Sequence, residues 1–286
     1  MFCFRIVLLV LAGGFFSLAE AQERPREAVA AEPLVIGQTF TLKSRALGET
    51  RRLNVYLPSG YAGSATLRLP VLYMPDGGLE EDFLHVAGLV QVLVGNGSMR
   101  PFILVGIENT QRRRDLTGPT TNKDDKKIAP VVGGSAAFRR FIREELIPEI
   151  QQRYRTTSER AIVGESLAGL FVVETLLLEP DMFNTYLAFD PSLWWNNEQL
   201  ANQASTLLQA PAGQPKVLYL ATSSNAGIDA PTRRLTQALA DKTGRKIAWY
   251  YAPMPLETHA TIYHPAALNA FRLVFKPQPT DSLKAH

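Results

Sequence analysis

The feature that most constrains the fold is a short apolar run that ends in a glycine–serine turn, Arg160-Ala161-Ile162-Val163-Gly164-Glu165-Ser166-Leu167-Ala168-Gly169-Leu170. The β-branched run before Gly164 predicts a buried strand, and apolar residues at helical spacing after Leu167 predict a helix that ends before Pro180. Ser166 then lies on a sharp turn, the setting of a nucleophile in a G-x-S-x-G motif, although Ala168 replaces the last glycine. We interpret Ser166 as a nucleophile, with a helix N-cap as the alternative.

The rest of the chain predicts a mostly parallel sheet with helices on both faces. Two antiparallel-looking strands, 35–42 and 52–57, precede a strand–helix alternation. The further predicted strands are 69–74, 101–107, 161–163, 185–189, 216–221 and 246–252. The further predicted helices are 80–94, 135–154, 198–208, 231–242 and 265–275, and 108–134 is a long loop. Because active sites of such sheets lie at the carboxyl ends of the strands, the residues that follow the strands should gather there.

The N-terminal residues 1–21 have the pattern of a secretory signal peptide, with an apolar run, Ile6 to Phe16, and an A-x-A cleavage site, Ala19-Glu20-Ala21. A membrane anchor is the alternative, but the run is short for a bilayer span. The single cysteine, Cys3, lies in this segment. We expect a periplasmic or secreted protein with no stable membrane anchor, in which 22–32 is a disordered lead-in, 33–278 one catalytic domain and 279–286 a tail.

Composition excludes several classes of partner. The chain has 286 residues, 46% of them hydrophobic, and a formal net charge of only +3, with no nucleic-acid-binding motif. We expect no nucleic-acid partner, no cofactor and no metal. The expected partner is a small-molecule ester, and the sequence indicates no particular oligomeric state.

The base that would activate Ser166 is predicted to be His259. It follows the last predicted strand and completes the chain order Ser, acid, His of α/β-hydrolases. His264 is the main alternative, because His85 lies inside a predicted helix and His286 ends the chain.

The acid of the triad is less clear from the sequence. The usual place is after the strand 216–221, where Asp229 is the first carboxylate, so we favour Asp229. Asp190, Glu257 and an uncharged Asn225 are alternatives. A Ser–His dyad, with His259 held by a carbonyl group, also stays open.

An oxyanion hole requires two backbone N–H groups. We predict those of Leu167, directly after the nucleophile, and of Gly77 in the turn Asp76-Gly77-Gly78 after the strand 69–74. An ordinary strand-ending turn is the alternative at Gly77. Arg112, Arg114, Trp194 and Trp195 lie on the same predicted rim, and we interpret them as substrate-binding residues. The alternatives are a solvated arginine loop and a tryptophan packed in the core.

The motifs together resemble the putative-esterase family of α/β-hydrolases, closest to the siderophore (enterochelin) esterase branch. The resemblance covers 34–275 and rests on Tyr73-Met74-Pro75-Asp76-Gly77, Val105-Gly106-Ile107-Glu108-Asn109-Thr110, Arg114-Asp115-Leu116-Thr117, Gly164-Glu165-Ser166-Leu167-Ala168-Gly169, Pro191-Ser192-Leu193-Trp194-Trp195 and Glu257-Thr258-His259. It implies Ser166 as nucleophile, His259 as base, and the Asp76-Gly77 turn and Leu167 as oxyanion donors. The chain departs from the family where elbows often read G-H-S-x-G-G, since Glu165 and Ala168 stand there.

The expected function is an exported serine ester hydrolase that acts through an acyl-enzyme. A siderophore trilactone is one expected substrate. The alternatives are a feruloyl or acetyl esterase on carbohydrates, an acyltransferase that excludes water, and a binding protein that keeps a hydrolase fold.

Overall fold

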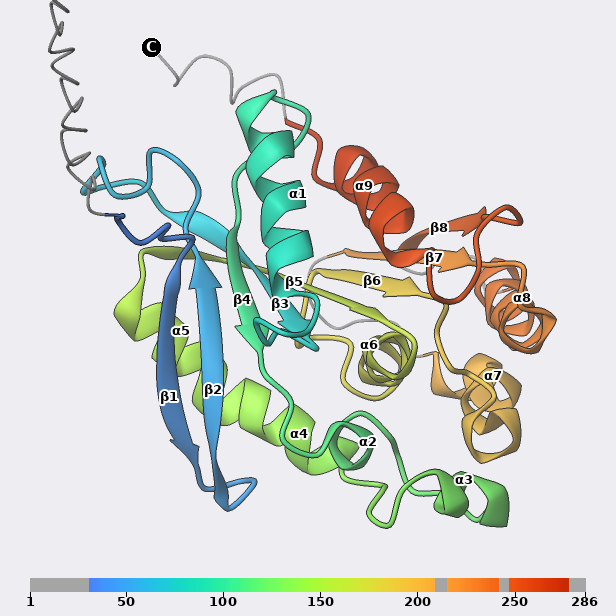
Figure 1. The fold of residues 1–286 in the computed structure, drawn as a ribbon. Coiled ribbons are helices and arrows are strands. Elements are labelled where there is room, and N and C mark those ends of the chain that lie inside the picture. The colour runs from blue at the N-terminus through green and yellow to red at the C-terminus, as the bar shows by residue number, and fades with distance from the viewer. Residues whose placement is uncertain (1–30, 209–214, 242–246, 278–286) are drawn as a thin grey trace, which may run out of the picture. The chain divides into compact units, whose positions relative to one another are not determined.

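The computed structural model describes residues 31–208, 215–241 and 247–277 (Figure 1). The predicted signal peptide and C-terminal tail lie outside the described residues, and so does nearly all of the predicted lead-in 22–32. The chain divides into two compact units, 1–35 and 36–286. The second unit contains every helix and strand of the described residues.

One eight-stranded sheet organises the described residues of this unit, in the order β1-β2-β4-β3-β5-β6-β7-β8. β1 (Gln38–Ser44) and β2 (Glu49–Tyr56) pair antiparallel, and β2 is also antiparallel to β4 (Ile103–Ile107). The other strands pair in parallel: β3 (Leu69–Pro75), β5 (Thr156–Glu165), β6 (Thr185–Phe189), β7 (Lys216–Thr222) and β8 (Ile247–Pro253). The predicted mostly parallel sheet is confirmed.

Helices cover both faces of the sheet because the parallel strands carry apolar side chains on both faces (Figure 1). α1 (Phe83–Gly95) and α9 (Tyr263–Val274) pack on one face, where Leu72 and Met74 of β3 join their cluster. Val71 and Tyr73 of the same strand point to the opposite core. That core is covered by α4 (Ser135–Phe141), α5 (Ile147–Arg153), α6 (Leu167–Leu178), α7 (Trp195–Leu207) and α8 (Ala226–Ala240).

Three predicted elements differ from the structure. The helix predicted over 135–154 contains a π-helical segment, η1 (Ile142–Leu146), between α4 and α5. Pro148 lies just after it, and a widened turn accommodates a residue that lacks the N–H of a regular helix. α8 begins before the predicted start at Pro231, because the Asn225 side chain caps it by accepting the N–H of Gly227. The predicted loop 108–134 contains two short helices, α2 (Arg112–Asp115) and α3 (Lys123–Ile128).

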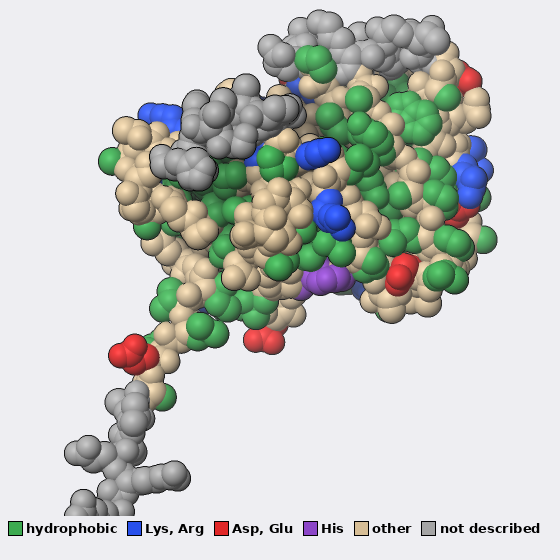
Figure 2. All heavy atoms as spheres, turned by 90° about the horizontal axis from the view of Figure 1, so that it is seen from above, with side chains coloured by type: hydrophobic (Ala, Val, Ile, Leu, Met, Phe, Trp, Pro, Cys, Tyr) green, Lys and Arg blue, Asp and Glu red, His purple; other side chains and the backbone are tan. Residues whose placement is uncertain are grey.

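The sequence has 30 Lys and Arg residues and 27 Asp and Glu residues, for a net charge of +3. On the face shown in Figure 2, Lys and Arg side chains are spread among hydrophobic and uncharged ones. No helix in the described ranges is long and apolar enough to cross a membrane.

Candidate active site

Ser166 lies on the turn between β5 and α6, with φ 60° and ψ −120°, a conformation that residues other than glycine rarely adopt. Its N–H donates to the carbonyl of Phe189 at 3.0 Å, which ties the turn to the end of β6. Small neighbours are required: a Cβ on Gly164 would lie 2.7 Å from Ala168, and one on Gly169 would lie 2.9 Å from the Phe189 carbonyl oxygen. The methyl group of Ala168 at the fifth motif position therefore fits because Gly164 has no Cβ, and Gly169 allows the close approach to the end of β6.

His259 bridges the nucleophile and a buried carboxylate. Its Nε2 lies 3.0 Å from Oγ of Ser166, and its Nδ1 lies 2.8 Å from Oδ2 of Asp190. The imidazole is 41% exposed, whereas the Asp190 side chain is fully buried. The hydrogen bond to Asp190 raises the pKa of His259 against the opposing effect of burial. The three side chains have the geometry of a nucleophile, a base and an orienting acid.

Asp190 is held rigidly at the end of β6. Its φ is 42°, and its N–H donates to the carbonyl of Ala221 at 2.8 Å. The N–H of Ser223 donates to Oδ1 and the Ser223 hydroxyl to Oδ2, both at 2.6 Å. Sequence reasoning missed Ser223, although a small polar residue directly after the neighbouring strand β7 was the available signal.

The structure corrects the favoured acid, because it does not bring Asp229 to His259. Asp229 lies in the first turn of α8 and accepts the Thr222 hydroxyl at 2.7 Å and the Tyr251 hydroxyl. It also pairs with Arg233 at 2.6 Å. Burial raises the pKa of Asp229, but these bonds outweigh it and lower the pKa overall. The Asp229 carboxylate therefore stabilises the contact between α8 and the ends of β7 and β8.

Asn225, Glu257 and His264 are also engaged away from the nucleophile. Asn225 caps α8, and the Glu257 carboxylate accepts the hydroxyl of Thr261 at 2.7 Å. His264 packs against His85, with 4.9 Å between ring centroids. Burial lowers the pKa of His85 to about 4, so it stays neutral near neutral pH.

Of the two predicted oxyanion donors, the N–H of Leu167 is available and the N–H of Gly77 is not. Leu167 is the first residue of α6, so its N–H has no acceptor within the helix. The N–H of Gly77 donates to the carbonyl of Ile107 at 3.0 Å, and this corrects the prediction that it faces an oxyanion. The N–H of Asp76 has no acceptor among the described residues, and its φ of 56° turns the chain there. Gly77 is instead needed for packing, because its Cβ would lie 2.3 Å from Cα of Gly106.

Arg112 holds the turn that carries Asp76. Its Nε and Nη2 donate to the two carboxylate oxygens of Asp76, each at 2.7 Å. Bonding to Asp76 raises the pKa of Arg112 although burial opposes it. Asn109 donates to the same carboxylate. The guanidinium of Arg112 therefore lies at the turn after β3, in a bidentate ion pair with Asp76.

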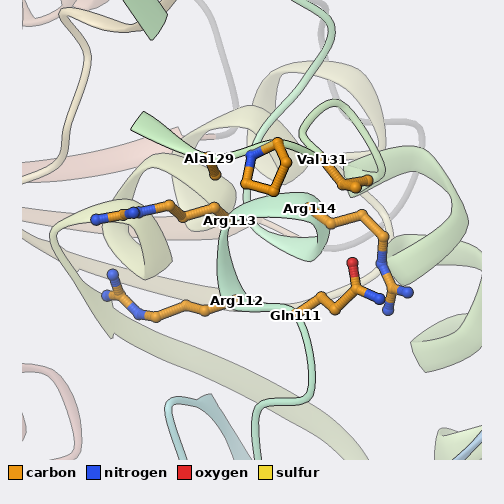
Figure 3. Close-up of a pocket in the computed structure, with 7 residues that line it drawn as sticks. Gln111, Arg112, Arg113, Arg114, Ala129 and Val131 are labelled. Carbon is orange, nitrogen blue, oxygen red and sulfur yellow. The ribbon is translucent and has the colours of Figure 1, made fainter. Parts of the chain in front are cut away.

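The arginine segment borders a pocket of about 440 Å³ (Figure 3). Its lining residues are Gln111, Arg112, Arg113, Arg114, Ala129, Pro130 and Val131. In Figure 3, Arg112 and Arg113 extend to one side of the segment and Arg114 to the other. Arg114 pairs with Glu49 at 2.7 Å and with buried Asp115 at 2.6 Å. These pairs tie α2 to β2, so Arg114 has a structural role, and its role in substrate binding stays a prediction.

The two tryptophans also have different places. Trp195 is only 5% exposed and packs in the core, and its Nε1 donates to the carbonyl of Gly118 at 2.9 Å. This bond holds the 118–121 segment, which corrects the prediction that Trp195 lines the substrate site. Trp194 is half-buried, with its ring centroid 6.0 Å from that of Trp195.

One cluster in the described chain has the composition of a metal site. Ligand atoms of Glu165, Asp190 and His259 lie within 4.8 Å of one another. Asp190 and His259 already bond to each other, and His259 bonds to Ser166. The absence of a metal stays a prediction.

The sheet order, the Ser166 turn and the histidine loop after β8 define an α/β-hydrolase fold. A family model described as putative esterase matches residues 44–246, and the chain belongs to this family. Membership supports hydrolysis of esters.

Individual proteins extend the similarity. The chain is 27% identical over 253 residues to the ferri-bacillibactin esterase BesA of Bacillus subtilis, covering 80% of this chain and 86% of that protein. It is 30% identical over 195 residues to a siderophore triacetylfusarinine C esterase of Aspergillus fumigatus, covering 62% and 63%. Among solved structures, an IroE-like serine hydrolase from Shewanella oneidensis is similar to this chain, with a TM-score of 0.74 and 30% sequence identity. The match covers 84% of this chain and 80% of that protein.

Proposed function

We propose that the chain is a serine ester hydrolase that acts through an acyl-enzyme. The observation that carries the proposal is the bridge made by His259, which lies within hydrogen-bond distance of both Ser166 and Asp190. Hydrolysis of an ester by this arrangement requires a hydroxyl nucleophile, a base beside it and a group that orients the base.

In the proposed mechanism, each step is carried out by a named group. Oγ of Ser166 attacks the ester carbonyl while its proton passes to Nε2 of His259. The N–H groups of Leu167 and Asp76 stabilise the oxyanion. The alcohol leaves with the proton from His259, and water, deprotonated by the same nitrogen, then releases the acid from Ser166.

A pair of serine variants tests this mechanism. Ser166→Ala should abolish p-nitrophenyl ester cleavage and labelling by a fluorophosphonate probe. Ser192→Ala is the control, because its hydroxyl lies 3.4 Å from that of Ser166 and, within the described residues, makes no hydrogen bond to His259, so labelling should persist. Labelling of Ser166→Ala at the wild-type rate would show that another residue is the nucleophile. A wild-type chain that binds esters without cleaving them or reacting with the probe would favour a binding protein.

For the substrate we propose a siderophore ester. The support is that relatives along most of the chain are named as siderophore esterases. The half-exposed Arg112 and the adjoining arginine pocket suit an anionic, oxygen-rich molecule. The test compares kcat/KM for a trilactone siderophore with that for p-nitrophenyl acetate and methyl ferulate. A preference for the trilactone supports the proposal; a preference for ferulate supports the carbohydrate esterase, and transfer to an added alcohol in place of water supports the acyltransferase.

We also propose that the protein is exported, on the strength of the signal-peptide pattern in residues 1–21. Cell fractionation followed by N-terminal sequencing tests this. A mature chain that begins at Gln22 in the periplasm or medium is expected, and an uncleaved chain in the membrane would favour an anchor.

A further inference from the structure

The residue in front of the nucleophile contacts the same histidine nitrogen as the acid. Oε1 of Glu165 lies 3.2 Å from Nδ1 of His259, while Oδ2 of Asp190 lies 2.8 Å from that atom. Nδ1 therefore faces two carboxyl groups, which come from the ends of two neighbouring strands, β5 and β6.

The Glu165 carboxyl group is largely buried, and one of its oxygens has no hydrogen bond to the described residues. Its side chain is 16% exposed, and Oε1 is buried without a hydrogen-bond partner of acceptable geometry among the described residues. A buried carboxyl oxygen without a hydrogen bond is costly, and such costs are concentrated at functional sites. Packing alone does not require a carboxyl group here, since a glutamine has the same shape.

The charge environment of Glu165 is set by four side chains from four segments. Burial is the largest influence and raises the pKa of Glu165 to about 8. The neighbouring charges of His259 and Arg112 oppose this rise, and those of Asp190 and Asp76 add to it. In return, the Glu165 charge raises the pKa of His259, after the larger effect of the Asp190 hydrogen bond. The two groups titrate as a coupled pair.

We propose that Glu165 is a positioning residue, a second carboxyl partner for Nδ1 of His259 that assists Asp190 in stabilising the imidazolium formed during acyl transfer. The inference rests on the proposed serine mechanism and adds a residue to it. When Ser166 attacks, its proton moves to Nε2, and the imidazolium carries N–H groups on both nitrogens. Asp190 accepts the Nδ1–H. Ionised Glu165 adds a second negative charge beside it, forms no covalent bond, and exchanges its own proton with solvent.

The pH profile of kcat/KM for p-nitrophenyl acetate tests the assignment. Wild-type activity should rise in two steps that belong to the His259–Glu165 pair, because the two groups lose their protons over overlapping pH ranges, and the second step should lie near pH 8. Glu165→Gln should lose the second step, shift the first to lower pH, and be at least about threefold slower than wild type at about pH 9. Glu165→Asp should recover part of the second step, and Glu257→Gln, a carboxyl change in the same loop as His259, should keep both. A Glu165→Gln profile with the wild-type shape, scaled equally at every pH, would overturn the proposal.

A second measurement does not depend on turnover. In the Ser166→Ala background, the imidazole of His259 should titrate at a lower pH when Glu165→Gln is added, as followed by NMR. An unchanged midpoint overturns the Glu165 assignment even if the serine mechanism holds. Full esterase activity of Ser166→Ala would instead contradict the serine mechanism. Failure of the Glu165 assignment and failure of the serine mechanism are therefore distinguishable.

Discussion

Oδ2 of Asp190 lies 2.8 Å from Nδ1 of His259, although the two residues are 69 positions apart in the chain. The strands β6 and β8 are separated by β7, so the loops after β6 and β8 must cross the end of β7 to meet. Ser223, directly after β7, binds the Asp190 carboxylate through both its N–H and its hydroxyl. The acid is therefore held from three strand ends at once.

Asp190→Asn should lower kcat about 10²- to 10⁴-fold with little change in KM, because an amide cannot stabilise the imidazolium as a carboxylate does. Asp229→Asn is the matched control and should stay close to wild type, since Asp229 bonds Thr222 and Arg233 instead. Steady-state kinetics with a p-nitrophenyl ester measure both. Equal losses in the two variants would contradict the assignment of Asp190.

Glu165→Gln should stabilise the protein increasingly as the pH rises from about 5 to about 8. In the folded chain the pKa of Glu165 is about 8, whereas in the unfolded chain it lies near its ordinary value. Between these values the folded state binds the additional proton, so wild-type stability falls with rising pH. We expect a gain on the order of 1 to 3 kcal/mol at the upper end of this range and little at the lower end, from urea unfolding. A gain that is the same at both ends would show that the carboxyl does not stay protonated on folding.

Gly77→Ala should destabilise the fold by at least about 2 kcal/mol, because the new Cβ would lie 2.3 Å from backbone atoms of β4. Gly88→Ala is the control: it lies in α1 with no atom within 4 Å of its Cβ position, so it should stabilise by about 0.5 to 1 kcal/mol. Thermal unfolding compares them. A neutral Gly77→Ala would mean that the turn relaxes away from β4.

Trp195→Phe should cost about 1 to 3 kcal/mol of unfolding free energy, because the buried carbonyl of Gly118 loses its donor. Trp194→Phe should cost less, since Trp194 is half-buried and no indole hydrogen bond holds it in the described structure. Denaturant unfolding measures both, and a larger cost at Trp194 would contradict the assignment of Trp195 as the anchor of the 118–121 segment.

Treatment with EDTA, followed by removal of the chelator, should leave esterase activity unchanged. The serine mechanism needs no cation, although Glu165, Asp190 and His259 have metal-binding side chains. Loss of activity that a divalent ion restores would instead assign this trio to a metal.

Much of the candidate site was predictable because it is local. The run before Gly164, the serine and the helix after it are one contiguous segment, and its hydrophobic pattern identifies a strand–turn–helix unit. The position of His259 after the last strand follows from the order of the elements. The same local reasoning was wrong at Gly77, since the direction of an N–H group depends on which strand pairs beside it.

The sequence by itself determined the fold class and the nucleophile turn, because strand and helix periodicity and a short motif are properties of neighbouring residues. Only the tertiary structure decided which carboxylate meets His259, which carboxylates pair with Arg112 and Arg114, and which tryptophan is buried. The sequence alone does not distinguish Asp190, Asp229 and Glu257 as the acid. The loops after β6 and β8 meet at the end of β7, and this brings Asp190 to His259. The same arrangement brings the imidazole within reach of Glu165, whose burial makes it titrate unlike an ordinary surface glutamate.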